Sequence, residues 1–183
     1  MLHHRLAGVA ILALIVSSVF PALAEAQTLQ LTGADGRVAS VDAAAIAALP
    51  RVSVPLTIHG TAHVFEGPRL IDVLKPVGVE TGEALRGPAL AQGVVVRAAD
   101  GYAVVYGLGE LDAGLRANAI ILADRVDGAP LAVEDGPFRV VVEGDLRPAR
   151  AMRQVTSVQV FGAPVPRTSE PRREQGVETP PNG

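Results

Sequence analysis

Two histidines are the first candidates for chemistry in this 183-residue chain. His59 and His63 lie around Gly60 in a strand–turn–strand pattern, and the nearest carboxylates that follow are Glu66 and Asp72. A zinc site needs three or four well-placed ligands, and two histidines with Glu66 as the acidic residue nearest in sequence are weak evidence for one. We therefore expect no metal site, and we expect the histidines to be polar residues on the surface or lining a pocket.

The other patterns for catalysis are weak or missing. Ser40, Ser53 and Ser157 lie in strand-like segments without the glycines of a nucleophile elbow. Residues 107–109 (Gly-Leu-Gly) lack the third glycine and the long helix of a phosphate-binding loop. The chain has no cysteine, which excludes disulfides, thiolate nucleophiles and thiolate metal ligands together. Hydrolytic chemistry therefore receives little support.

Arginines are the informative group. Four of them fall within fifteen residues, at Arg139, Arg147, Arg150 and Arg153. A guanidinium presents a rigid fork of donors that fits a phosphate or carboxylate, so several on one loop could hold an anionic ligand. The alternative is that they only decorate the surface, and the pattern alone does not choose between the two. The formal net charge of −3 makes nucleic acid a poor candidate for a partner.

The first 24 residues have the pattern of an export signal. A short basic start at His3, His4 and Arg5 precedes an apolar run over residues 6–20, and Pro21 ends that run. Small residues before and after residue 24 fit a cleavage site. An uncleaved anchor would need about 20 apolar residues to cross a bilayer, and this run is shorter. We expect residues 1–24 to be a signal peptide and the mature protein to be periplasmic.

The rest of the chain is rich in short strands. Hydrophobic alternation, buried runs and turn residues predict strands over 28–31, 37–41, 52–58, 61–65, 93–98, 102–106, 119–123, 138–142 and 155–161, and short helices over 43–49, 69–75 and 108–115. There is no βαβ rhythm, so the fold class is α+β. Residues 25–162 form the expected domain. Residues 163–183 lack hydrophobic periodicity and are expected to be a disordered tail.

A series of short segments in a fixed order carries a family resemblance. The segments are residues 65–74, 98–102, 122–124, 127–131, 136–142, 144–145, 147–150 and 155–158. In this order and spacing they resemble the molybdopterin-binding domain of the sulfite oxidase family, especially its short stand-alone bacterial members. The resemblance implies an α+β fold with a mixed sheet or barrel and a few short helices.

The resemblance also implies a set of ligand-binding residues. Arg139 matches the family's arginine on the phosphate side of the pterin cofactor, and Arg147 and Arg150 match its basic pair. The family's His or Asn before the conserved glycine falls near Asp135, an acid in this chain. Tyr102 is a candidate for stacking against a flat heterocycle, and the alternative is that it packs as an ordinary strand residue.

The family's molybdenum-ligating cysteine would lie within residues 51–63, where this chain has none. That thiolate is the family's direct protein bond to molybdenum, and soft metals prefer such ligands. The resemblance therefore implies a pterin or a molybdopterin-like ligand, with no molybdenum and no catalysis by the usual mechanism.

Three functions follow as hypotheses. The first is a periplasmic pterin-binding protein, similar to short exported members that report metal-free pterins to a membrane sensor controlling cyclic-di-GMP turnover. Its partners would be the pterin and the periplasmic domain of that membrane protein. The second is a molybdopterin-dependent oxidoreductase, or a subunit of one, that holds its cofactor without the cysteine. The third is a protein-interaction domain whose pocket is vestigial.

Overall fold

The computed structural model describes residues 28–163. The expected signal peptide, residues 1–24, lies outside the described residues, as does the expected tail beyond residue 163. None of the helices between residues 28 and 163 has the length and apolar character needed to cross a bilayer.

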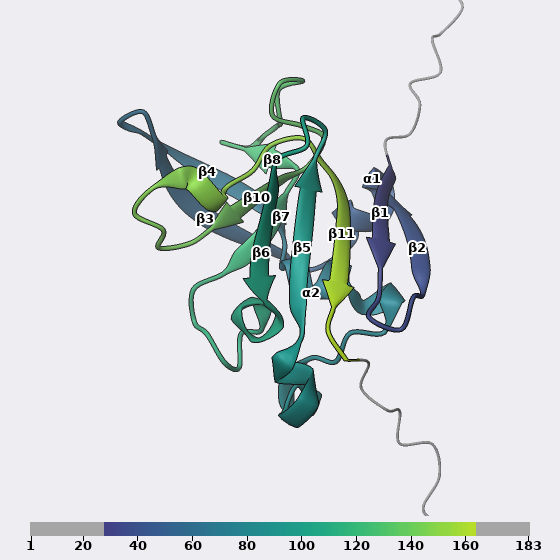
Figure 1. Cartoon of the computed structure of the whole chain (residues 1–183). Coiled ribbons are helices and arrows are strands. Elements are labelled where there is room, and N and C mark those ends of the chain that lie inside the picture. Colours follow the sequence, from purple (N-terminus) through teal and green to yellow (C-terminus); the bar gives the residue numbers. More distant parts are fainter. Residues whose placement is uncertain (1–27, 164–183) are drawn as a thin grey trace, which may run out of the picture.

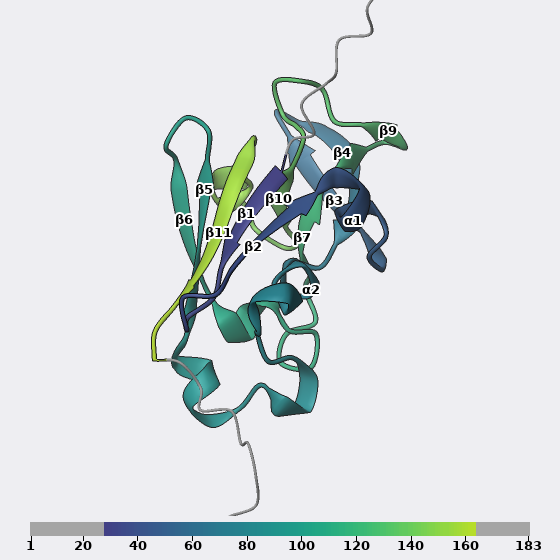
Figure 2. The same cartoon turned by 90° about the vertical axis from the view of Figure 1, so that its right-hand side faces the viewer.

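The larger sheet has five strands in the order β2-β1-β11-β5-β6 (Figures 1 and 2). Their bounds are β1 Thr28–Thr32, β2 Val38–Asp42, β5 Gly93–Ala98, β6 Ala103–Gly107 and β11 Val155–Phe161. β1 pairs with β11 in parallel, and the other neighbours pair antiparallel. Leu29 and Leu31 of β1 are fully buried while their neighbours face outward, as the alternation of a strand with one buried face requires.

A second sheet of four strands has the order β3-β4-β8-β9. Its strands are β3 Arg51–Ile58, β4 Thr61–Pro68, β8 Arg125–Val126 and β9 Ala129–Pro130. Between the two sheets lies the antiparallel pair β7 (Ile120–Ala123) and β10 (Arg139–Val142), as Figure 2 shows. All residues of this pair are buried, because one face contacts the core below the five-stranded sheet and the other contacts the core of the β3–β4 side. That double burial explains the apolar sequence of β7 and of residues 140–142 in β10.

Helices are few and short. They are α1 Ala43–Ala47 and α2 Leu70–Val73, with single 3-10 turns η1 Lys75–Val77, η2 Gly82–Ala84, η3 Gly87–Ala91, η4 Leu108–Leu111 and η5 Pro148–Arg150. The Asp42 carboxylate caps α1 by accepting the Ala45 N–H at 2.8 Å, as expected of this residue type before a helix. Mixed sheets with brief helices confirm the α+β expectation.

One local expectation from the sequence was wrong, and one element was missed. The helix expected over 108–115 ends at Leu111, because the buried Asp112 accepts the N–H groups of Gly82 and Gly114, both at 2.7 Å, and turns the chain. The β8–β9 hairpin was not expected, since its two-residue strands around the Asp127 turn are too short to produce a periodic pattern.

Candidate functional site

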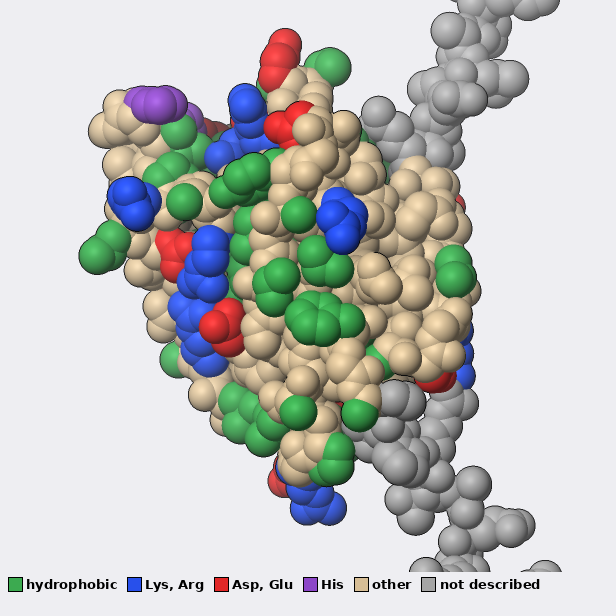
Figure 3. Space-filling model, in the orientation of Figure 1, with side chains coloured by type: hydrophobic (Ala, Val, Ile, Leu, Met, Phe, Trp, Pro, Cys, Tyr) green, Lys and Arg blue, Asp and Glu red, His purple; other side chains and the backbone are tan. Residues whose placement is uncertain are grey.

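A cavity of about 690 Å³ opens where the β3–β4 hairpin, β8, the turn before β6, and the loop around η5 meet. Its polar lining comes from elements far apart in the sequence. These residues are His59, His63, Asp100, Tyr102, Asp127, Asp135, Arg139, Arg153 and Gln154. In Figure 3, histidine, basic and acidic side chains gather around the upper left of the molecule.

Arg139 is the most enclosed charged residue of the cavity. It begins the buried strand β10 and only 6% of its surface is exposed. Its Nη1 atom lies 3.1 Å from Asp135 Oδ1, and its guanidinium lies 5.1 Å from the ring centroid of Phe65. The Nε atom is buried with no hydrogen-bond partner among the described residues. Burial lowers the pKa of Arg139, and Asp135 opposes that shift.

A buried donor without a partner costs free energy, and more so on a charged group. The orphaned Nε therefore marks a guanidinium whose hydrogen-bonding capacity this chain does not satisfy. Because the Nε atom itself is buried, a ligand acceptor in the cavity would have to bind the other nitrogens of that guanidinium.

Asp135 joins two arginines at one side of the cavity. Arg153 Nε lies 3.7 Å from the same Oδ1 atom that Arg139 contacts. The backbone fixes this group, because the Asp135 N–H donates to Ala132 at 2.9 Å and the Asp135 carbonyl accepts from Gln154 at 3.0 Å. The cavity thus presents a carboxylate and guanidinium donors side by side.

His63 and Asp127 form a second polar pair on the β4–β8 side. His63 Nδ1 lies 2.7 Å from Asp127 Oδ2, and the Val64 N–H donates to Oδ1 at 2.8 Å. These contacts lower the pKa of Asp127, first through the Val64 donor and then through His63. Since an ionised carboxylate only accepts, Nδ1 is the donor in this contact. The His63 ring meets the Phe65 ring at 6.3 Å in an edge arrangement.

Tyr102 lines the cavity and is half exposed. Its hydroxyl donates to the carbonyl of Ala149 at 2.9 Å. The phenol thus fastens the loop around η5, which forms part of the cavity wall. Within residues 28–163 no group of three or more histidine and acidic side chains is arranged to hold a metal ion.

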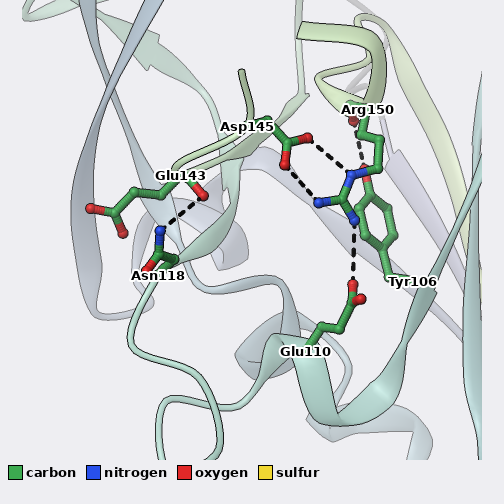
Figure 4. Close-up of polar contacts among 6 residues, drawn as sticks. All are labelled: Tyr106, Glu110, Asn118, Glu143, Asp145 and Arg150. Atoms are coloured by element: carbon green, nitrogen blue, oxygen red, sulfur yellow. Dashed lines mark hydrogen bonds and ion pairs between the residues drawn. The ribbon is translucent and has the colours of Figure 1, made fainter. Parts of the chain in front are cut away.

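Arg150 does not line the cavity. Its Nε and Nη2 atoms bind the two carboxylate oxygens of Asp145 at 2.9 and 2.7 Å, and Nη1 lies 3.4 Å from Glu110 (Figure 4). The guanidinium lies over the Tyr106 ring at 5.6 Å, and the Tyr106 hydroxyl donates to the Arg150 carbonyl at 2.6 Å. The hydrogen bond to Asp145 raises the pKa of Arg150.

The structure therefore divides the five expected ligand-binding residues. Tyr102, Asp135 and Arg139 lie around one cavity, whereas Arg147 and Arg150 do not line it. Arg147 is exposed. The backbone of their loop does reach the cavity, through Pro148 and Ala149.

Sequence reasoning missed part of the cavity. Asp127 was noted only as a turn residue, and it reaches His63 because β8 pairs with β4 across more than 60 residues of chain. His59 and His63 were expected on the surface or in a pocket, and both line this one. Arg153 belongs to the arginine cluster but was not selected, since nothing local distinguishes it from Arg150.

The segment expected to carry the family's cysteine borders the same cavity. Residues 51–63 form β3, its turn and the start of β4, and the cavity is lined there by Ile58, His59 and His63. This segment thus contributes three residues to the wall of the cavity that Arg139 also lines.

No protein-family model matches this chain, and no curated protein matches it. Among solved structures, it is similar to the sulfane dehydrogenase SoxCD from Paracoccus pantotrophus, with a TM-score of 0.54 and 13% sequence identity. The similarity covers 73% of this chain and 38% of that chain, so this chain spans well under half of its neighbour. At this identity the likeness shows the fold alone, an α+β fold of the sulfite-oxidase-like type.

Proposed function

We propose that this chain binds a pterin in the cavity beside Arg139, without molybdenum and without catalysing a reaction. The observation that carries the proposal is a guanidinium that is almost completely buried, lines the cavity, and has a buried Nε with no partner within residues 28–163. A cavity of about 690 Å³ lies within the range of small-molecule sites. Asp135, Arg139 and Tyr102 would contact the ligand.

The residues that line the cavity fit a metal-free pterin ring better than a cofactor that carries molybdenum. The chain has no cysteine, so it cannot supply the thiolate that the family resemblance implies for molybdenum. Three carboxylates, Asp100, Asp127 and Asp135, line the cavity with two arginines. That balance suits a flat heterocycle with donors and acceptors, because a strongly anionic ligand would meet the carboxylates.

We further propose that the mature protein works in the periplasm and reports its ligand to the periplasmic domain of a membrane signalling protein. The signal-like pattern of residues 1–24 and the resemblance to short exported members support this part. The net charge of −3 argues against nucleic acid as a partner.

The test begins with protein purified from the periplasm of its native host. Denatured extracts are examined for pterin fluorescence and by mass spectrometry, and molybdenum is measured on the same sample. We expect a pterin without stoichiometric metal. Added pterin at 100 times its dissociation constant should stabilise the protein by about 2.7 kcal/mol, which a melting curve detects. Extracts without pterin and no stabilisation would contradict the proposal and favour an interaction domain.

A second candidate function is a molybdopterin-dependent oxidoreductase or a subunit of one. The likeness to a sulfane dehydrogenase favours it. The same metal measurement separates the two candidates, because stoichiometric, tightly bound molybdenum would establish the oxidoreductase and contradict our proposal.

A further inference from the structure

We infer that the Asp135–Arg139 pair recognises the amino-oxo edge of a neutral pteridine ring and that the cavity disfavours a phosphorylated one. This inference rests on the proposed function and adds the chemical feature by which the ligand is selected. It assigns the two residues different tasks, an acceptor and a donor that face the same edge of the ring.

The two groups are held together on the cavity wall. Asp135 Oδ1 lies 3.1 Å from Arg139 Nη1, and both residues line the cavity. Asp135 is partly exposed, with 30% of its side-chain surface accessible. Both arginine contacts go to Oδ1, and no hydrogen bond from the described part of the chain reaches Oδ2. A ligand therefore meets a carboxylate acceptor beside a guanidinium donor.

A 2-amino-4-oxopteridine carries the complementary pattern. Its 4-oxo group accepts, while the ring N3–H and the 2-amino group both donate in the same direction. A carboxylate accepts two such donors, and a guanidinium donates to the oxo group. Asp135 and Arg139 thus match three adjacent groups of the ring, which a ring with a different substitution pattern does not present.

The charges around the pair argue against a phosphate. Arg139 is already paired with Asp135, and Arg153 approaches the same carboxylate. Asp100 and Asp127 add two more carboxylates to the lining, while Arg147 and Arg150 contribute none of it. Like charges at short range repel, and the lining holds three carboxylates against two guanidiniums, so its charge balance disfavours a phosphate.

The test is a titration of the mature full-length protein with a ring series. The probes are pterin, lumazine and 2,4-diaminopteridine. Lumazine replaces the 2-amino donor with an oxo group, and 2,4-diaminopteridine replaces the 4-oxo acceptor with a donor and turns the ring N3–H into an acceptor. We expect lumazine to bind about tenfold more weakly than pterin, the loss of one charge-assisted hydrogen bond, and 2,4-diaminopteridine to bind more weakly still. 6-Hydroxymethylpterin should bind more tightly than its phosphate ester.

Asp135→Asn tests the acceptor directly. The amide keeps the size of the side chain but replaces one acceptor with a donor, so the preference for pterin over lumazine should disappear. Glu134→Gln is the matched control, because Glu134 is exposed on the same turn, outside the cavity lining, and carries the same charge. That variant should keep the preference.

The outcomes separate this inference from the proposed function. If the wild type binds all three rings within about threefold, or binds the phosphate ester more tightly than the alcohol, the inference is overturned and pterin binding stands. An unchanged preference in Asp135→Asn overturns it as well. If no pteridine binds the wild type, the proposed function itself fails. The wild-type ring series remains decisive even if Asp135→Asn does not fold.

Discussion

Arg139 and Arg150 lie eleven positions apart, and they occupy opposite electrostatic situations. Arg150 is bound by the Asp145 carboxylate through two hydrogen bonds, with Glu110 as a third contact. Arg139 has one carboxylate neighbour at 3.1 Å and a buried Nε without a partner in the described structure. Their pKa shifts run in opposite directions, because burial lowers that of Arg139 and the hydrogen bond to Asp145 raises that of Arg150.

This difference indicates that Arg139 keeps hydrogen-bonding capacity that the chain does not use, whereas Asp145 occupies two donors of Arg150. Arg150 serves the site indirectly, as a positioning residue. It anchors the loop around η5, whose Pro148 and Ala149 line the cavity. Tyr102 and Tyr106 hold the same loop by donating to the carbonyls of Ala149 and Arg150. One region is the proposed contact surface, and the other is its support.

The largest effect on pterin affinity is expected from Arg139→Met. Pterin affinity should fall roughly tenfold to a hundredfold, as expected for the loss of charge-assisted hydrogen bonds. The free energy of unfolding should change little, because the substitution removes a desolvated charge with an orphaned Nε, while Asp135 is 30% exposed and keeps Arg153 nearby. Isothermal titration and denaturant melts measure the two effects. A large loss of stability with unchanged affinity would reverse the roles that we assign.

Arg150→Met should show the opposite pattern. We expect a loss of about 1–2 kcal/mol in unfolding free energy, since Asp145 loses both hydrogen bonds and is only 17% exposed at its side chain. Pterin affinity should stay within about threefold of wild type. Arg147→Met is the control, because Arg147 is exposed and its replacement should change stability by less than about 0.5 kcal/mol.

Tyr106→Phe tests the support of the loop around η5, which Tyr106 holds through the Arg150 carbonyl. Loss of the hydrogen bond to the Arg150 carbonyl should destabilise by about 1 kcal/mol at neutral pH. Burial raises the pKa of the Tyr106 phenol, so its contribution to stability is complete below the ordinary tyrosine pKa of about 10 and is lost as the pH rises above it. Denaturant melts at pH 8 and pH 11 should show a smaller alkaline loss in the variant. Equal losses would contradict this account.

The smallest effect on stability is expected from Asp127→Asn, on the β4–β8 side of the cavity. The Val64 N–H and His63 lower the pKa of Asp127, so the ionised carboxylate stabilises the fold above the ordinary aspartate pKa of about 4. That stabilisation is lost as the pH falls below this value. The stability difference between wild type and variant should therefore shrink between pH 5 and pH 2. A constant difference over that range would show that the ionised carboxylate does not carry it.

The sequence predicted the fold better than the site because strands and turns have local signatures. The buried strand β7 and residues 140–142 of β10 were visible as apolar runs, and the alternation in β1 matched its observed burial. The β8–β9 hairpin was not visible in the sequence, because strands of two residues are too short to show an alternating pattern.

The arginine assignments needed information that spacing does not contain. Arg139 faces the cavity because it begins a strand enclosed between two cores. Arg150 contacts Glu110, which lies 40 residues earlier in the sequence, and no local sequence pattern predicts that contact. Asp145, five residues before Arg150, was the one nearby sign that this guanidinium would find a partner within its own loop.

The position of β11 has a consequence for how the molecule is made. The last strand of the domain lies between β1 and β5 and hydrogen-bonds to both, as Figure 1 shows. Until residues 155–161 have been synthesised, the hairpins β1–β2 and β5–β6 have no strand to join them. Completion of the larger sheet therefore requires the end of the domain, and a chain truncated before residue 155 would retain two halves of that sheet with no strand between them.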